Sequence, residues 1–362
     1  MQSPLFSILI TSYNRPEYLG QCIGSVMANT GVDFEIIISD DASPAVDKID
    51  EVMRQYLGDS RVNFHRQKQN IGEPANRNFL VNQSQGQYTI ILCDDDMLAP
   101  RALQGIRNQL TLHPDHDLYG LGYSVIDGGG DLCYSRVAPA GIEIDLEHPE
   151  NVRRLFEAKS LPFLICHPSS FCCKQGVERR IPYRNDVCTA DDLMFLLECI
   201  NEGERFYIIP ENLVYYRSFL SAEATQQINQ SADTAKVLQS FARVYYALQQ
   251  REDLNPLVSN LIRGRHYRAR FLYSQILRRM YVDHENLATL DITGHHKEEL
   301  LKYAAKPWTY LLLLRTYLSI AVELTQLFGV CGIIHFYKVV AAYCRYKVFA
   351  HRRWLSMPIA LE

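Results

Sequence analysis

Three consecutive aspartates, Asp94, Asp95 and Asp96, stand directly after the apolar run from Tyr88 to Cys93, and their type and spacing suit metal chemistry. Neighbouring carboxylates repel one another, so holding three of them beside an apolar strand costs free energy unless a cation or hydrogen bonds compensate. Mg²⁺ and Mn²⁺ take one or two carboxylate ligands together with phosphate and water oxygens. The triplet therefore predicts a divalent metal and diphosphate site; the alternative is that Asp96 caps the helix expected after Pro100.

Two further groups of polar residues could contact a ligand. Asp40 and Asp41 end a second apolar run, where a carboxylate can accept the imide N–H of uracil or thymine or cap the following turn. In the next group, Gly72 permits a tight turn and Pro74 suits a first helical turn. Arg77 stands one turn further on. Its guanidinium could donate paired hydrogen bonds to a phosphate or ribose, or Arg77 could be an ordinary exposed arginine.

Asp191 and Asp192 open a predicted helix and are the candidate general bases. A transfer reaction needs only one well-placed carboxylate to take the proton of an acceptor hydroxyl. The alternative is a pair of acids favoured by the partial positive charge at a helix N-terminus.

The elements that must position these residues alternate between strands and helices, which predicts an α/β fold with βαβ units. Strands are expected at residues 6–12, 34–39, 61–65, 88–93, 118–126 and 167–173, and helices at 15–28, 51–57, 73–83, 101–112 and 193–201. The acids follow the strands, which is where ligands bind in open α/β sheets. After residue 221 the sequence predicts helices without strands.

The motifs together resemble a known family. In chain order they are Thr11-Ser12-Tyr13-Asn14-Arg15, Ser39-Asp40-Asp41-Ala42-Ser43, Asn70-Ile71-Gly72 with Ala75-Asn76-Arg77-Asn78, Asp94-Asp95-Asp96 and Asp191-Asp192. This order closely resembles the inverting family-2 glycosyltransferases with the GT-A fold, over about residues 4–217. The resemblance implies a Rossmann-like mixed sheet flanked by helices. We expect a nucleotide-sugar-binding half at 1–100, an acceptor-binding half at 101–220, and a helical C-terminal extension beginning with 221–300.

The resemblance also implies roles for single residues. Those that would bind the nucleotide sugar are Thr11, Tyr13 and Arg15 in the nucleotide pocket, Asp41 on the base, Arg77 near the ribose or diphosphate, and Asp94 and Asp95 on the donor. Asp95 or Asp96 would hold Mn²⁺ or Mg²⁺. The family's catalytic acid stands second in a Glu-Asp pair, which falls on Asp192. Because Asp191 replaces the Glu, Asp191 stays the alternative base.

Two departures from the family pattern bear on function. Many members carry a His shortly after a Tyr-Arg pair, whereas this chain continues from Tyr216-Arg217 with Ser218-Phe219. The Gln-x-x-Arg-Trp motif of processive synthases is also missing, which favours addition of a single residue.

The predicted function is metal-dependent transfer of a sugar, with inversion, from a nucleotide diphosphate sugar to a hydroxyl group. The expected donor is a UDP-sugar. The expected acceptor is a saccharide or a lipid-linked saccharide in polysaccharide biosynthesis. One alternative is a non-catalytic sugar-nucleotide-binding or assembly subunit. The other is a nucleotidyltransferase, which would carry a Gly-rich basic loop after the first strand. No glycine occurs from Thr11 to Pro16.

Composition restricts the partners and the compartment. The 37 basic and 41 acidic residues give a net charge of -4, so no nucleic-acid partner is expected. The ten cysteines include no Cys-x-x-Cys pair and predict reduced, buried thiols. The run from Phe6 to Ser12 is typical of a strand rather than a secretory leader. These features favour a cytoplasmic body.

Residues 301–362 differ in composition from the rest, with eight Lys or Arg against two Glu among aromatic and aliphatic blocks. The pattern predicts amphipathic basic helices that dock on the inner face of the cell membrane. The alternative is a helical pair packed on the body of the chain or on another subunit; the second case would make the chain a homo-oligomer.

Overall fold

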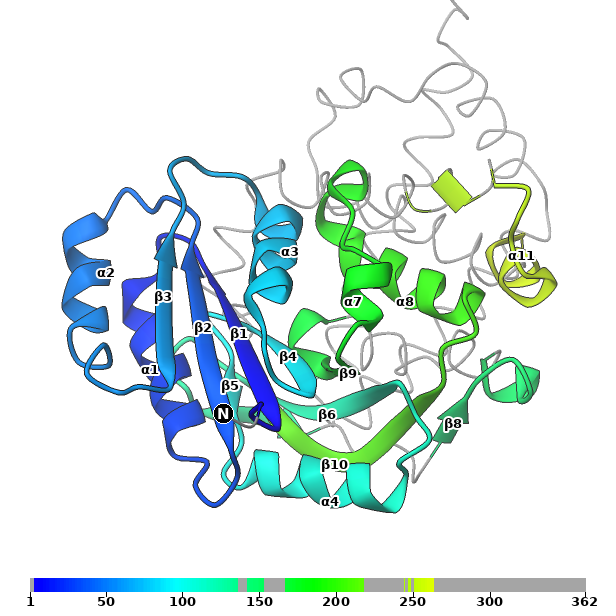
Figure 1. Cartoon of the computed structure of the whole chain (residues 1–362), viewed down its shortest axis with the longest axis horizontal. Coiled ribbons are helices and arrows are strands. Elements are labelled where there is room, and N and C mark those ends of the chain that lie inside the picture. Colours follow the sequence, from blue (N-terminus) through cyan, green and yellow to red (C-terminus); the bar gives the residue numbers. More distant parts are fainter. Residues whose placement is uncertain are drawn as a thin grey trace, which may run out of the picture. The chain divides into compact units, whose positions relative to one another are not determined.

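The computed structural model describes residues 3–135, 142–152, 167–217 and 251–263, together with Val244, Ala247 and Leu248 (Figure 1). All of these residues belong to one compact unit, formed by residues 1–227 and 239–264. A second unit comprises residues 228–238 and 265–362. The predictions for 301–362, and most of those for 221–300, lie outside the described residues.

The strands of the described residues form one mixed sheet, as the sequence predicts. Its path is β3 (Val62–Arg66), β2 (Phe34–Asp40), β1 (Phe6–Ser12), β4 (Tyr88–Cys93), β9 (Phe171–Lys174), β6 (Leu118–Ile126), β10 (Phe206–Arg217) and β5 (Met97–Leu98). Two short strands lie off this path, β7 (Leu132–Ser135) beside β6 and β8 (Ile142–Ile144) beside β10. The first four strands are parallel, and β9 is antiparallel to both of its neighbours, β4 and β6.

Helices cover the sheet and complete the α/β fold. In chain order they are α1 (Pro16–Met27), α2 (Val46–Met53), α3 (Glu73–Gln83), α4 (Ala102–Leu112), α7 (Val177–Arg180), α8 (Asp191–Asn201) and α11 (Pro256–Arg263). Helix α3 packs against β1 and β2, and α4 runs along β10 (Figure 1). Every residue of β1 and β2 is buried, which agrees with their near-continuous apolar sequences.

Several elements differ from the sequence prediction. The strand expected at 167–173 is a 3₁₀ turn, Pro168–Ser170, followed by β9, and the short elements β5, β7, β8 and α7 were not predicted. Helix α2 spans Val46–Met53 rather than 51–57, because the apolar residues it buries are Ile49 and Met53, one turn apart. Strand β10 was not predicted. Its apolar alternation is broken at Pro210, where the pairing with β6 shifts register between Ile208 and Asn212.

The strand register brings the acidic turns together. Thr11 at the end of β1 lies level with Cys93 of β4, and Ser12 lies level with Asp40 of β2. The segments after all three strands therefore leave the sheet at the same edge.

Candidate active site

Arg15 joins the turn after β1 to the aspartates after β4. Its Nη1 lies 3.0 Å from a carboxylate oxygen of Asp94 and 3.0 Å from one of Asp95. The backbone N–H of Tyr13 also donates to Asp94, at 3.2 Å. Arg15 and Tyr13 are about half exposed, with exposed fractions of 47% and 48%, whereas Asp94 is buried. The exposed pair can therefore contact a ligand at this sheet edge.

Asp96 is buried and does not cap a helix. Its carboxylate accepts a hydrogen bond from Ser169 Oγ at 2.6 Å and one from the backbone N–H of Arg217 at 2.9 Å. The same Oδ2 lies 3.6 Å from Nε2 of His167. Helix α4 begins at Ala102 without a side-chain cap. The alternative reading of Asp96 as the cap of this helix is therefore wrong.

Burial makes this group of acids difficult to ionise. Desolvation raises the pKa of Asp94 and that of Asp96 to about 7, although Arg15 and several hydrogen bonds favour the ionised forms. Burial and the neighbouring Asp96 raise the pKa of Asp95. Desolvation lowers the pKa of His167 to about 4, so its ring is neutral at pH 7. Its Nδ1 accepts the backbone N–H of Ser169 at 3.3 Å, so binding of a metal at Nε2 requires that this hydrogen bond be released and the ring proton move to Nδ1.

Asp96 and His167 have the chemistry of a metal site, and Cys93 lies close enough to join them. Burial raises the pKa of the Cys93 thiol, so this side chain stays protonated. A carboxylate and a neutral imidazole together suit Mn²⁺ better than Mg²⁺, because Mg²⁺ strongly prefers oxygen ligands. The sequence prediction did not include His167.

The acids at the end of β2 fix two different turns. Asp41 accepts hydrogen bonds from the backbone N–H groups of Ile71 at 2.7 Å and Gly72 at 3.0 Å, ahead of α3. It is Asp40 that holds the following turn, by accepting from the backbone N–H of Ser43 at 3.1 Å. A carboxylate offers about four acceptor positions, so Asp41 can still accept a base N–H. Thr11, at the end of β1, is buried with an exposed fraction of 7%.

Arg77 is neither an exposed arginine nor open to a ligand from solvent. Its exposed fraction is 2%. Its guanidinium donates to Glu73, one turn earlier on α3, and to Asp191 at the start of α8. It also lies over the ring of Tyr183, 5.6 Å from the ring centre. This position differs from the ribose or diphosphate contact that the resemblance implies.

The two acids of α8 have different surroundings. Asp191 is buried and bound by Arg77, whereas Asp192 is partly exposed and accepts only the backbone N–H of Leu193, at 2.6 Å, among the hydrogen bonds of the described residues. Desolvation first, and the charge of Asp191 second, raise the pKa of Asp192. Asp192 is thus the carboxylate able to meet an acceptor.

Arg217 supports the aspartate turn from β10, a role that the sequence prediction missed. Its guanidinium donates to the backbone carbonyls of Asp95 at 2.8 Å and of Asp127 and Gly128, each at 3.0 Å. The Tyr-Arg sequence drew attention to the position, but nothing local indicated this contact.

The mixed sheet, with acids at the ends of its parallel strands, has the architecture of a GT-A-like fold. The structure is similar to S. aureus TarS residues 1–349 in complex with UDP-GlcNAc, with a TM-score of 0.58 at 13% identity over 94% of this chain and 92% of that chain. It is also similar to the mannosyltransferase PcManGT from Pyrobaculum calidifontis in complex with GDP-Man and Mn²⁺, with a TM-score of 0.55 at 14% identity over 91% and 88% of the two chains. At these identities the likeness shows the fold.

Sequence comparison gives the family. The family described as "Glycosyl transferase family 2" matches residues 7–173. An uncharacterized glycosyltransferase of Methanocaldococcus jannaschii is 30% identical over 219 residues, which cover 60% of this chain and 72% of the relative. The uncharacterized glycosyltransferase EpsJ of Bacillus subtilis is 26% identical over 218 residues, which cover 59% of this chain and 61% of the relative. The chain belongs to glycosyl transferase family 2, which confirms the predicted resemblance and makes it a glycosyltransferase.

Proposed function

We propose that this glycosyltransferase moves a sugar from a nucleotide diphosphate donor, with UDP as the leading candidate, to an acceptor hydroxyl with inversion, and that the reaction depends on a divalent metal. The observation that carries the proposal is the placement of Asp94, Asp95 and Asp96 with His167 at the sheet edge, together with a partly exposed Asp192 at the start of α8.

The metal part of the proposal rests on the donor set. Asp96 Oδ2 and His167 Nε2 lie 3.6 Å apart, which is less than twice the usual ligand distance of about 2.0–2.2 Å, so one ion could contact both. Asp95, which is less buried than Asp96, could share the ion or contact the donor. When bound, a divalent ion offsets the negative charge of the diphosphate.

The remaining residues have complementary tasks in the proposal. Asp41 accepts the imide N–H of the base, Thr11, Tyr13 and Arg15 line the nucleotide pocket, and Asp94 contacts the ribose. Asp192 takes the proton of the acceptor hydroxyl, and displacement at the anomeric carbon on the face opposite the leaving group gives inversion. Asp191 accepts a hydrogen bond from Arg77, so we give it a supporting role rather than that of the base.

The acceptor proposal rests on sequence alone. The basic, aromatic composition of residues 301–362 supports a membrane-bound acceptor, such as a lipid-linked saccharide, in polysaccharide biosynthesis at the inner face of the membrane. In the part of the chain that the structure describes, we find no helix with the length and hydrophobicity to span a bilayer.

The test is nucleotide release from UDP-, dTDP- and GDP-sugars with and without Mn²⁺, together with calorimetric binding of each donor. We expect Mn²⁺-dependent release from one donor and its loss in Asp96→Ala. Asp192→Asn should keep donor affinity and lose about 10²- to 10⁴-fold in turnover. Glu202→Gln, which changes an exposed acid at the other end of α8, is the matched control and should turn over normally.

Each contrary result has a definite meaning. Near-normal turnover of Asp192→Asn with intact donor binding would remove Asp192 as the base. Nucleotide binding without release from any donor would favour the non-catalytic alternative over this proposal.

A further inference from the structure

Arg77 is among the largest fully buried side chains of the described residues. A buried guanidinium is stable only when carboxylates and hydrogen bonds replace its hydration. Glu73 and Asp191 supply that replacement, and the bond to Asp191 spans 114 positions in the sequence. The arginine thus joins α3, which follows the nucleotide-binding turns, to the helix that carries the proposed base.

A second contact holds the same two parts together without charge. Asn78, the residue after Arg77, donates its Nδ2 to the carbonyl of Tyr183 at 2.7 Å, and its Oδ1 accepts the N–H of Tyr183 at 2.9 Å. Tyr183 lies in the segment that leads into α8. Asn78 therefore fixes the position of this segment, and Arg77 adds an electrostatic effect to the same junction.

The charged groups facing Asp192 have opposite effects on it. Asp191, the preceding residue on α8, raises the pKa of Asp192, and so does Glu73 on α3. Arg77 lowers the pKa of Asp192, and the N–H of Leu193 acts in the same direction. The only positive charge acting on Asp192 among these groups is therefore that of Arg77.

We infer that Arg77 is a positioning residue, held by Glu73 and Asp191, whose charge keeps Asp192 available as a proton acceptor. The inference rests on the proposed role of Asp192. It assigns Asp191 the role of an anchor for Arg77, and it removes Arg77 from the groups that contact the donor diphosphate.

The inference predicts opposite shifts in two variants. Arg77→Met leaves Asp191 and Glu73 as uncompensated charges near Asp192, so the acidic limb of the pH profile of kcat/KM should move to higher pH. Asp191→Asn removes a negative charge and keeps Arg77, so that limb should move to lower pH. A neighbouring opposite charge typically changes the pKa of an Asp by about 1–3 units, which sets the upper size of each shift. Arg77→Met/Asp191→Asn should return the limb toward that of the wild type, and Arg77→Lys should shift it least.

Asn78→Ala is the matched control, because it loosens the same junction without changing a charge. It should lower thermal stability and leave the acidic limb in place. The UDP dissociation constant, measured by calorimetry with Mn²⁺, should change less than twofold in Arg77→Met. If that variant does not fold, Asp191→Asn still tests the electrostatic argument, because its acidic limb must move to lower pH, whereas that of Arg77→Lys, which keeps the positive charge, must stay close to that of the wild type.

Three results would overturn the inference. If Arg77→Met or Arg77→Lys loses tenfold or more in UDP affinity while the acidic limb of the pH profile stays in place, Arg77 contacts the donor diphosphate. Equal shifts in Asn78→Ala and Arg77→Met would make the effect structural. Shifts of the same sign in Arg77→Met and Asp191→Asn would contradict the electrostatic argument.

Carbon-13 NMR titration of the Asp191 and Asp192 carboxyls in the same variants reads ionisation without turnover. If the NMR shifts appear but Asp192→Asn remains active, the base assignment fails and the electrostatic role of Arg77 stands. If the wild type transfers sugar and neither NMR nor kinetics shifts, the proposed function stands and the inference about Arg77 fails.

Discussion

At the scale of single residues, Asp96 combines structural and chemical tasks. Its carboxylate accepts the Ser169 hydroxyl and the N–H of Arg217, which fix its orientation, and it faces His167 across 3.6 Å. Such outer hydrogen bonds are what orient a carboxylate ligand toward a metal. Asp96 therefore has its orientation before any ion binds.

His167→Asn should weaken Mn²⁺ binding in the presence of UDP, because it removes one of the two ligands that we propose. Changes to groups that merely orient ligands cost about 10- to 100-fold in metal affinity, so we expect at least such a loss. The measurement is the electron paramagnetic resonance signal of free Mn²⁺ during titration. His65→Asn, on β3, is the control and should leave the titration unchanged. Unaltered Mn²⁺ affinity in His167→Asn, beside a clear loss in Asp96→Asn, would show that His167 is not a ligand.

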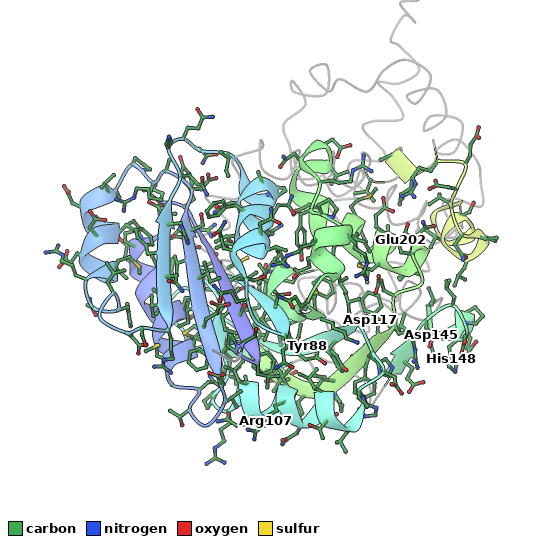
Figure 2. All side chains as sticks on the ribbon, viewed as in Figure 1. Tyr88, Arg107, Asp117, Asp145, His148 and Glu202 are labelled. Atoms are coloured by element: carbon green, nitrogen blue, oxygen red, sulfur yellow. The ribbon has the colours of Figure 1, made fainter. Side chains whose placement is uncertain are left out.

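His148 and Asp145 give a prediction about pH that is independent of the active site. Figure 2 shows the two side chains near each other beside β8, and His148 Nδ1 lies 2.8 Å from Asp145 Oδ1. The hydrogen bond and charge of Asp145 raise the pKa of His148 above its usual 6.5. Stabilisation by this pair is therefore complete below pH 6.5 for as long as Asp145 is ionised, and it is lost as the pH rises through the folded-state pKa of His148.

Asp145→Asn should return the NMR titration midpoint of His148 toward 6.5, because the amide keeps an acceptor but loses the charge. The Asn side chain can still accept the N–H groups of Glu147 and His148 that Asp145 holds, so the turn should persist. A midpoint that does not move would mean that the charge of Asp145 is not the cause.

At the scale of elements, the sequence predicted those helices and strands that their local residue pattern is sufficient to define. β1 and β4 are apolar runs that are followed by polar residues, and α8 is an amphipathic run that begins with two acids; their observed bounds match or nearly match the predicted ones. β10 could not be predicted in this way, because its partner β6 stabilises it across a break at Pro210. Pairing with a distant strand overrides local pattern in such cases.

The candidate site likewise contains residues that the sequence could predict and residues that it could not. The acids at strand ends were predictable, because parallel strands bring their carboxyl ends to one edge. The approach of His167 to Asp96 was not, since it depends on β9 entering the sheet between β4 and β6. The burial of Arg77 likewise depends on a partner far along the chain.

Gly122→Ala tests the irregular pairing of β6 with β10. A Cβ at this position would lie 2.5 Å from the carbonyl oxygen of Glu211 and 2.9 Å from Asn212 Oδ1, where β10 shifts register. The strand backbone must move to admit it, so we expect a loss of about 1–3 kcal/mol in the free energy of unfolding, measured with denaturant.

Gly120→Ala, two residues earlier on the same strand, is the matched control for that variant. Its Cβ would meet its nearest neighbour, Ile208 Cγ1, at 3.6 Å, which is an ordinary contact. Both substitutions change backbone entropy alike, so equal destabilisation of the two would contradict the steric argument.

At the scale of the whole molecule, charge is unevenly distributed along the sequence. Residues 301–362 contain eight of the 37 basic residues but only two of the 41 acidic ones, so the rest of the chain is net acidic. An anionic membrane would repel the body and attract the C-terminal segment. If the chain docks on lipid, this segment is the part that electrostatics favours.

Replacing Lys338, Arg345, Lys347, Arg352 and Arg353 with Gln in the full chain should therefore abolish sedimentation with phosphatidylglycerol vesicles. Each basic residue near an anionic surface contributes about 1 kcal/mol, so five substitutions remove several kcal/mol of binding free energy. Wild-type binding should also weaken with added salt and be weak on phosphatidylcholine vesicles.

A second full-length variant, with Lys48, Arg54 and Lys68 replaced by Gln, separates the segment's effect from that of overall charge. These residues are exposed on the body and should contribute little to vesicle binding. Light scattering of both variants tests the alternative of self-association. If the C-terminal variant still binds vesicles but loses an oligomeric mass that the wild type has, residues 301–362 form a contact between copies, and a lipid-linked acceptor loses its support from this segment.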